Sequence, residues 1–123
     1  MTADDIFNTV LGLMFCTKEE KADYESSFIP MLNIVLAETF HMNNARRMGS
    51  GKEELSSIPE VKKLSDEIEY EDIILRKTVP YGVAGMLYAE DDDTGMGNYY
   101  REKYEQMKAE TGFVRFEPAI EEV

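Results

Sequence analysis

Residues 48–53, with the sequence MGSGKE, form the segment most similar to a phosphate-binding loop. Such a loop holds phosphates with backbone amides and a lysine, and binds magnesium through a Ser or Thr after that lysine. The motif requires a glycine five residues before Gly51, where this chain has Arg46, and Glu53 stands where the Ser or Thr is needed. We therefore interpret the segment as the end of a helix followed by a loop, without nucleotide binding.

Residues that commonly bind metals or perform catalysis are few and scattered. Asp91, Asp92 and Asp93 are consecutive, which does not match the spaced ligands of a calcium loop, so an exposed acidic turn is expected. His41 is the single histidine and has no second ligand one helical turn away. Cys16 is the single cysteine, which excludes an internal disulfide and favours a small buried apolar side chain. We predict no cofactor, no metal and no enzymatic activity.

The main basic cluster consists of Arg46, Arg47 and Lys52. It follows a predicted helix, so two interpretations remain open. The cluster can contact an acidic partner or a phosphate group. Alternatively, the positive charges can stabilise the negative end of the helix dipole within the monomer.

Composition predicts a folded protein without affinity for nucleic acid. The 123 residues suffice for one domain with a single core, and 43% of them are hydrophobic. The net charge of −12 opposes the phosphate neutralisation on which nonspecific nucleic-acid binding depends. No apolar run approaches the ~20 residues that span a bilayer. The opening residues MTADDIF lack the basic segment of a secretory signal, so a soluble, cytoplasmic protein without membrane contact is expected.

Apolar residues at helical spacing predict an all-α fold, a small four-helix bundle with a long irregular loop. The expected helices cover 3–15, 27–48, 70–90 and 94–111. A charged link at 17–23 and a loop at 49–70 connect them, and the loop can include a short strand near 61–64. The second helix should follow a cap at Ser26 or Ser27, with Pro30 in its first turn. The predicted buried stripes are Ile6, Val10, Leu13 and Met14; Phe28, Met31, Leu32, Val35, Thr39 and Met42; Leu75, Val79, Val83 and Leu87; and Met96, Tyr100, Tyr104 and Met107.

The third predicted helix contains a proline and several small residues. Pro80 removes one backbone hydrogen bond and should bend this helix. Gly82, Gly85 and Ala89 lie close to one face. Because each glycine costs a helix about 1 kcal/mol, we expect them to allow the backbone of a neighbouring helix to approach.

The C-terminal segment, residues 112–123, is predicted to be an extended arm beyond a helical domain at residues 1–111. Phe113, Phe116 and Ile120 give it apolar character without the spacing that would bury them on the bundle. A terminus that stays unfolded or lies against the long loop is one interpretation. The other is an arm that docks on a neighbouring chain.

Five short motifs in the second half of the chain carry a resemblance to a known family. They are PEV at 59–61, LSDEI at 64–68, PYGVA at 80–84, EDDD at 90–93 and NYYREKY at 98–104. Together they resemble the head–tail connector, or adaptor, proteins of tailed bacteriophages and prophages. The resemblance covers residues 59–108, about half of the chain.

The resemblance implies a non-enzymatic protein that assembles as a ring beneath the portal, twelvefold in the virion, and joins the capsid to the tail. Its implied partners are the portal protein, tail or stopper proteins and neighbouring copies of itself. DNA would pass through the channel without specific binding, which agrees with an acidic lumen that repels it. The implied location is the virion, and the bacterial host cytoplasm during assembly.

The sequence therefore leaves two functional hypotheses of different kinds. The first is the head–tail adaptor, and the alternative is a small acidic, antitoxin-like regulatory protein that binds one cytoplasmic partner. The residues predicted to contact partners are Arg46, Arg47, Val61, Leu64, Phe113, Phe116 and Ile120.

Overall fold

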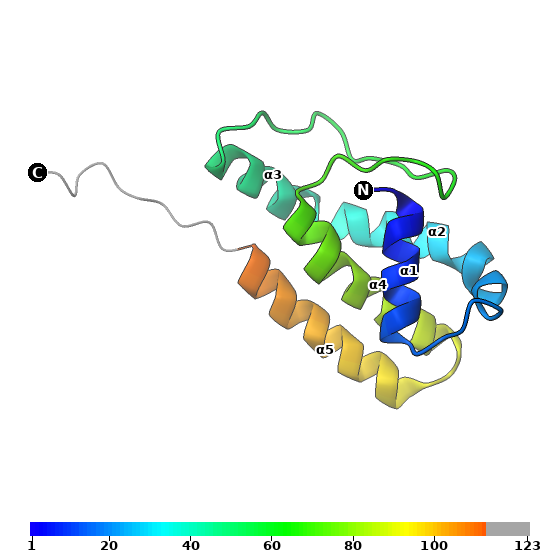
Figure 1. Cartoon of the computed structure of the whole chain (residues 1–123). Coiled ribbons are helices and arrows are strands. Elements are labelled where there is room, and N and C mark those ends of the chain that lie inside the picture. The colour runs from blue at the N-terminus through cyan, green and yellow to red at the C-terminus, as the bar shows by residue number, and fades with distance from the viewer. Residues whose placement is uncertain (113–123) are drawn as a thin grey trace, which may run out of the picture.

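Helices dominate the structure, a computed structural model that describes residues 1–112 (Figure 1). The elements are α1 (Ala3–Leu13), α2 (Lys21–Glu38), α3 (Phe40–Gly49), the π-helical turn η1 (Ile74–Thr78), α4 (Val79–Glu90) and α5 (Thr94–Thr111). Within residues 1–112, strand-like pairing is limited to one isolated bridge between Thr2 and Glu67. The predicted all-α fold is thus confirmed, whereas the short strand near 61–64 is wrong. The predicted arm lies outside the described residues, except for Gly112.

Helix α4 occupies the centre of the bundle, with α1, α2 and α5 packed around it (Figure 1). Its sequence VPYGVAGMLYAE has no charged residue before the last position, so it is apolar on nearly all sides. A helix of this kind is stable in water only when other helices cover it. The predicted stripe of α4 and the preceding turn is confirmed, because four side chains on it are at most 1% exposed: Leu75, Val79, Val83 and Leu87.

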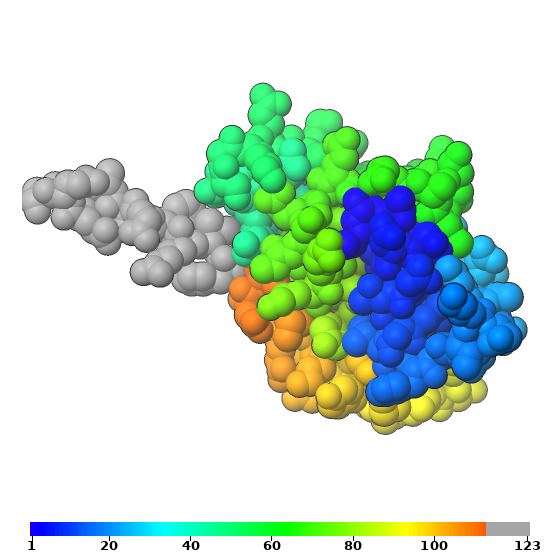
Figure 2. Space-filling view, in the orientation of Figure 1, coloured from blue at the N-terminus to red at the C-terminus, as the bar shows by residue number. Residues whose placement is uncertain are grey.

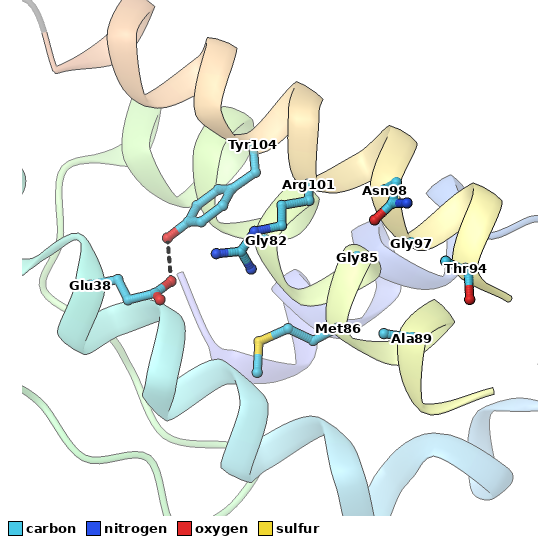
Figure 3. Close-up of a pocket in the computed structure, with 10 residues that line it drawn as sticks. All are labelled: Glu38, Gly82, Gly85, Met86, Ala89, Thr94, Gly97, Asn98, Arg101 and Tyr104. Atoms are coloured by element: carbon cyan, nitrogen blue, oxygen red, sulfur yellow. Dashed lines mark hydrogen bonds between the residues drawn. The ribbon is translucent and has the colours of Figure 1, made fainter. Parts of the chain in front are cut away.

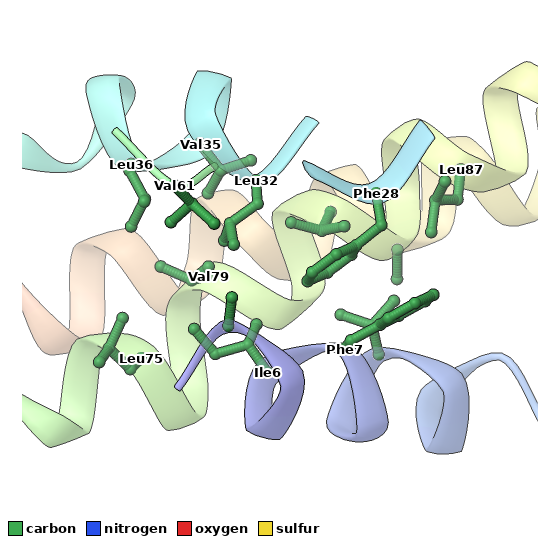
Figure 4. Close-up of a cluster of buried hydrophobic side chains, with 14 of the residues drawn as sticks. Ile6, Phe7, Phe28, Leu32, Val35, Leu36, Val61, Leu75, Val79 and Leu87 are labelled. Carbon is green, nitrogen blue, oxygen red and sulfur yellow. The ribbon is translucent and has the colours of Figure 1, made fainter. Parts of the chain in front are cut away.

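The core lies between α1, α2 and α4 (Figure 4). Phe7 of α1 and Phe28 of α2 stack with their ring centroids 4.2 Å apart. Around this pair, Ile6, Leu32 and Val79 are fully buried. Each such side chain contributes about 1.5–3 kcal/mol when it leaves water. These contacts fix α1 and α2 on α4.

The N-terminal end of α2 differs from the prediction. The helix begins at Lys21, not after Ser26 or Ser27, and Pro30 lies in its interior. The reason is local, because Thr17 and Glu20 exchange hydrogen bonds ahead of it, with Glu20 N–H donating to Thr17 Oγ1 at 3.4 Å. This turn starts the helix within the segment that was expected to be a link.

The predicted helix at 27–48 is in fact two helices that meet at Thr39. The Thr39 hydroxyl donates to the carbonyl oxygen of Val35 at 2.8 Å, and the backbone at Thr39 leaves helical geometry with φ −101° and ψ 4°. A threonine side chain that bonds back to the preceding turn competes with the helix and bends it. Helix α3 therefore takes its own direction toward the long loop.

Pro80 alters the helix before it, as expected, but through a π-helical turn. Val79 N–H donates to the carbonyl oxygen of Ile74, five residues back. The ring of a proline has no N–H and collides with the carbonyl four residues earlier, here that of Arg76. The wider π turn at 74–78 accommodates this position. The helical segment starts at residue 72, so Tyr70 lies outside it.

Helices α4 and α5 approach each other at backbone distance, as the small residues predicted. A Cβ atom on Gly85 would lie 3.2 Å from the backbone nitrogen of Arg101 and 3.4 Å from the carbonyl oxygen of Gly97. A Cβ atom on Gly82 would lie 2.9 Å from the ring of Tyr104. Glycine at these positions is therefore a requirement of the packing.

Gly85→Leu should lower the free energy of unfolding by about 1–3 kcal/mol, because the new side chain would have to displace the backbone of α5. Thermal and denaturant unfolding, followed by circular dichroism, measure this change. Gly12→Ala is the matched control, since a Cβ there meets no atom within 4 Å. The control should unfold at the wild-type temperature or above. A Gly85→Leu protein as stable as the control would contradict the close packing.

Candidate interaction surfaces

The loop at residues 50–71 is fastened to α2 and α3 by asparagine side chains that pair with its backbone. Asn33 Nδ2 donates to the carbonyl oxygen of Val61 at 2.9 Å, and Val61 N–H donates to Asn33 Oδ1 at 2.8 Å. Asn44 forms the same two-bond pair with Leu55, at 3.1 and 2.8 Å. A primary amide copies the pairing of a neighbouring strand, so the loop is held without a sheet.

The loop also completes the N-terminal end of α1. Ala3 N–H donates to the carbonyl oxygen of Asp66, and Asp4 N–H donates to that of Leu64, both at 2.9 Å. These are donors that a helix leaves without partners in its first turn. The Asp66 carboxylate accepts backbone hydrogen bonds from Lys62 and Lys63, and these bonds lower the pKa of its carboxyl group. The loop is thus connected to three helices.

Arg46 and Arg47, which were predicted as partner contacts, both bond to the chain's own backbone. Arg47 Nε donates to the carbonyl oxygen of Glu53 at 2.7 Å, and its Nη1 donates to that of Glu69 at 3.1 Å. Arg46 Nη1 donates to the carbonyl oxygen of Thr111 at 2.7 Å, at the C-terminal end of α5. Both arginines therefore help to hold the loop ends and the last turn of α5 in place.

Two of the other predicted contact residues, Val61 and Leu64, are packed into the protein. Val61 is only 3% exposed and belongs to the core, and Leu64 is partly buried against it. Phe113, Phe116 and Ile120 lie outside the described residues. Val61 and Leu64 thus lie on the same loop whose backbone Arg47 binds. The contacts of the C-terminal segment stay a prediction.

A groove of about 220 Å³ runs between α2, α4 and α5 (Figure 3). Gly82 and Gly85 of α4 leave room along its floor, and the guanidinium of Arg101 extends into it from α5 (Figure 3). At one end Tyr104 Oη donates to Glu38 Oε1 at 2.9 Å. Burial, followed by this bond to a carboxylate, raises the pKa of the Tyr104 phenol. This groove was not predicted from the sequence, although the spacing of Gly82 and Gly85 was a signal for it.

The groove has groups for hydrogen bonding. Its polar lining consists of Glu38, Thr94, Asn98, Arg101 and Tyr104. A carboxylate, a guanidinium and an amide can pair with a polar backbone segment. The groove is therefore suited to binding.

The single cysteine and the single histidine belong to different elements, with Cys16 after α1 and His41 in α3. Cys16 is partly buried, and burial raises the pKa of its thiol. His41 is exposed and packs edge-on against Phe40. Across residues 1–112, no three His, Cys, Asp or Glu side chains gather in a way that could hold a metal ion. No helix in this part of the chain is long and apolar enough to cross a bilayer.

Comparison with models of protein families, with curated proteins and with solved structures finds no match for this chain.

Asn33→Ala should destabilise the protein by about 1–3 kcal/mol, because it leaves the N–H and C=O of buried Val61 without partners. Denaturant unfolding gives the free energy, and limited proteolysis reports whether the loop becomes accessible near residue 58. Asn98→Ala is the control, since Asn98 is exposed on α5, and it should change stability by less than about 0.5 kcal/mol. Equal stability of the two variants would show that the asparagine pairs do not hold the loop.

Proposed function

We propose that this chain is a non-enzymatic head–tail connector of a tailed bacteriophage or prophage. The observation that carries the proposal is that three of the motifs that resemble the connector family form the packing and the cap of the α4–α5 helix pair. Pro80 of PYGVA follows the π turn, and Gly82 makes room for Tyr104 of NYYREKY. Asp93 of EDDD accepts from Met96 N–H at 3.1 Å and caps α5. Motifs with such roles favour a structural protein over an enzyme.

In the proposed function, copies of the chain form a ring beneath the portal, twelvefold in the virion, and present a platform for tail or stopper proteins. The net charge of −12 supports a channel wall that repels DNA and lets it slide. The firmly held loop supports the proposal as well, because a subunit of a ring must keep its shape under load. The proposed locations are the virion and, during assembly, the host cytoplasm.

An antitoxin-like regulatory protein that binds one cytoplasmic partner is the second candidate. The groove between α2 and α5 is the observation that favours it, because a single peptide segment would fit between these helices. Genes for capsid and portal proteins beside the gene for this chain would favour the connector, and a toxin gene beside it would favour the regulator.

The isolated chain should be a monomer or a weak oligomer, and should form rings on a portal template. Like-charged subunits repel one another until specific contacts offset the repulsion. Light scattering across protein and salt concentration measures the first state, and electron microscopy of the chain mixed with the portal protein encoded beside it measures the second. A tight dimer insensitive to salt, with no density added to the portal, would contradict the connector.

Deletion of residues 113–123 should leave the bundle folded and abolish docking to the portal or ring formation. The last helix ends at Thr111, so no described helix is shortened. Circular dichroism measures folding, and the same microscopy measures docking. A truncated chain that loses helicity would place the segment in the fold of the monomer. One that folds and still docks would assign the contact to another surface.

A further inference from the structure

Phe15 follows the end of α1 in a conformation that is unusual for a large side chain. Its φ is +56°, in the left-handed region, where L-residues with a side chain are disfavoured and glycine is usual after a helix. Phe15 N–H donates to Gly12 O, and Cys16 N–H donates to Leu11 O, which completes the helix end. The Phe15 side chain is 86% exposed, so its ring gains little from the rest of the described chain.

The backbone beneath Phe15 is held in place by two tyrosines. Tyr100 Oη donates to the carbonyl oxygen of Leu13 at 2.7 Å, and Tyr88 Oη donates to that of Met14 at 3.4 Å. These bonds connect the last turn of α1 to α4 and α5. The ring of Phe15 therefore stands on a fixed support, and a partner that covered it would have little backbone to order.

Phe15 lies beside an acidic end of the molecule, which we define as residues 17–25 and 90–93. The next residue, Cys16, interacts with Glu20 and Asp91 of this end. The two segments are joined, because Tyr24 Oη donates to Asp91 Oδ2 at 2.6 Å and Ser27 Oγ donates to Glu90 Oε1 at 2.8 Å. Figure 2 shows the blue α1–α2 turn beside the yellow α4–α5 turn. The acidic end contains two lysines and eight exposed carboxylates, at Glu19, Glu20, Asp23, Glu25, Glu90, Asp91, Asp92 and Asp93.

We propose that Phe15 is the anchor of a docking surface for a partner protein that has an apolar pocket rimmed by Lys and Arg. The inference rests on the proposed function, in which such a partner belongs to the head or the tail. Aromatic residues, Phe among them, are enriched in the cores of protein interfaces, where they anchor binding by filling pockets of the partner. The acidic end around it selects a cationic rim and accelerates the encounter.

The charge of the acidic end favours this kind of partner over other molecules that could bind the same surface. The acidic end has a net charge of −6, half of the charge of the whole chain, so nucleic acid and anionic membranes are repelled. A second copy also fits poorly. Its largest basic cluster is already used internally, with Arg47 on the loop backbone and Lys52 paired with Glu71 at 2.9 Å.

The test replaces Phe15 with the photo-crosslinking amino acid p-benzoylphenylalanine in host cells that assemble particles. Irradiation followed by mass spectrometry should identify one partner protein, crosslinked at a surface with several Lys or Arg residues. The same replacement at Ile58, which is 48% exposed on the loop, is the control and should not crosslink that surface. A crosslink to a second copy, or none above the control, would overturn the inference.

Binding of the purified partner then measures the contribution of each group. Phe15→Gly should weaken binding at least 10-fold while raising the melting temperature of the free chain, because glycine suits the left-handed backbone. Glu19→Lys, on an exposed residue of the acidic end, should weaken binding and reduce its dependence on salt. Unchanged affinity in the Phe15→Gly protein would overturn the inference. If the crosslinked partner is neither a portal nor a tail protein, the anchor stands and the proposed function fails.

Discussion

The rest of the structure depends on the close backbone contact between α4 and α5. Because Gly82 and Gly85 have no side chains, α5 lies near enough for Tyr100 to reach the end of α1 and for Tyr104 to reach Glu38 of α2. These two tyrosines connect α5 to helices that it otherwise contacts little. A wider separation of α4 and α5 would leave both tyrosine hydroxyls without their partners. It would also expose the side of α4 that α5 now covers. The glycines thus determine how closely α5 approaches α4, and with it the tyrosine bonds from α5 to α1 and α2.

A second constraint is that the long loop has no strand or helix to satisfy its backbone groups. Side-chain amides and a guanidinium perform this task, through Asn33, Asn44 and Arg47. The amide of Asn43 takes part as well, since its Oδ1 accepts from Glu71 N–H at 2.8 Å. The conformation of the loop therefore depends on polar residues of α2 and α3. Their hydrogen bonds place apolar loop residues such as Val61 in the core.

The sequence predicted those features that depend on apolar spacing and glycine. The buried stripe around Val79 and the close α4–α5 contact are confirmed, because both follow from residue size and helical period. The break at Thr39, the π turn before Pro80 and the backbone bonds of Arg47 depend on which partner a polar group finds in space. Sequence spacing carries little information on that choice. The sequence left open whether the arginines contact a partner or stabilise a helix end, and it did not predict the bonds of Arg47 to the loop backbone. The groove was missed because it lies between three helices whose relative positions were unknown.

The distribution of charge and apolar surface limits how such a chain can associate. At a net charge of −12, broad nonspecific contact between copies is opposed, so a stable assembly must come from a few localised contacts. The exposed large apolar side chains of the described residues lie on separate elements: Phe15, Ile34, Met48, Ile58 and Tyr99. Single exposed apolar residues of this kind are normal on a protein surface. Contacts with several different neighbours can use them one at a time, as the proposed connector would require when it touches a ring neighbour on one face and another protein at its end.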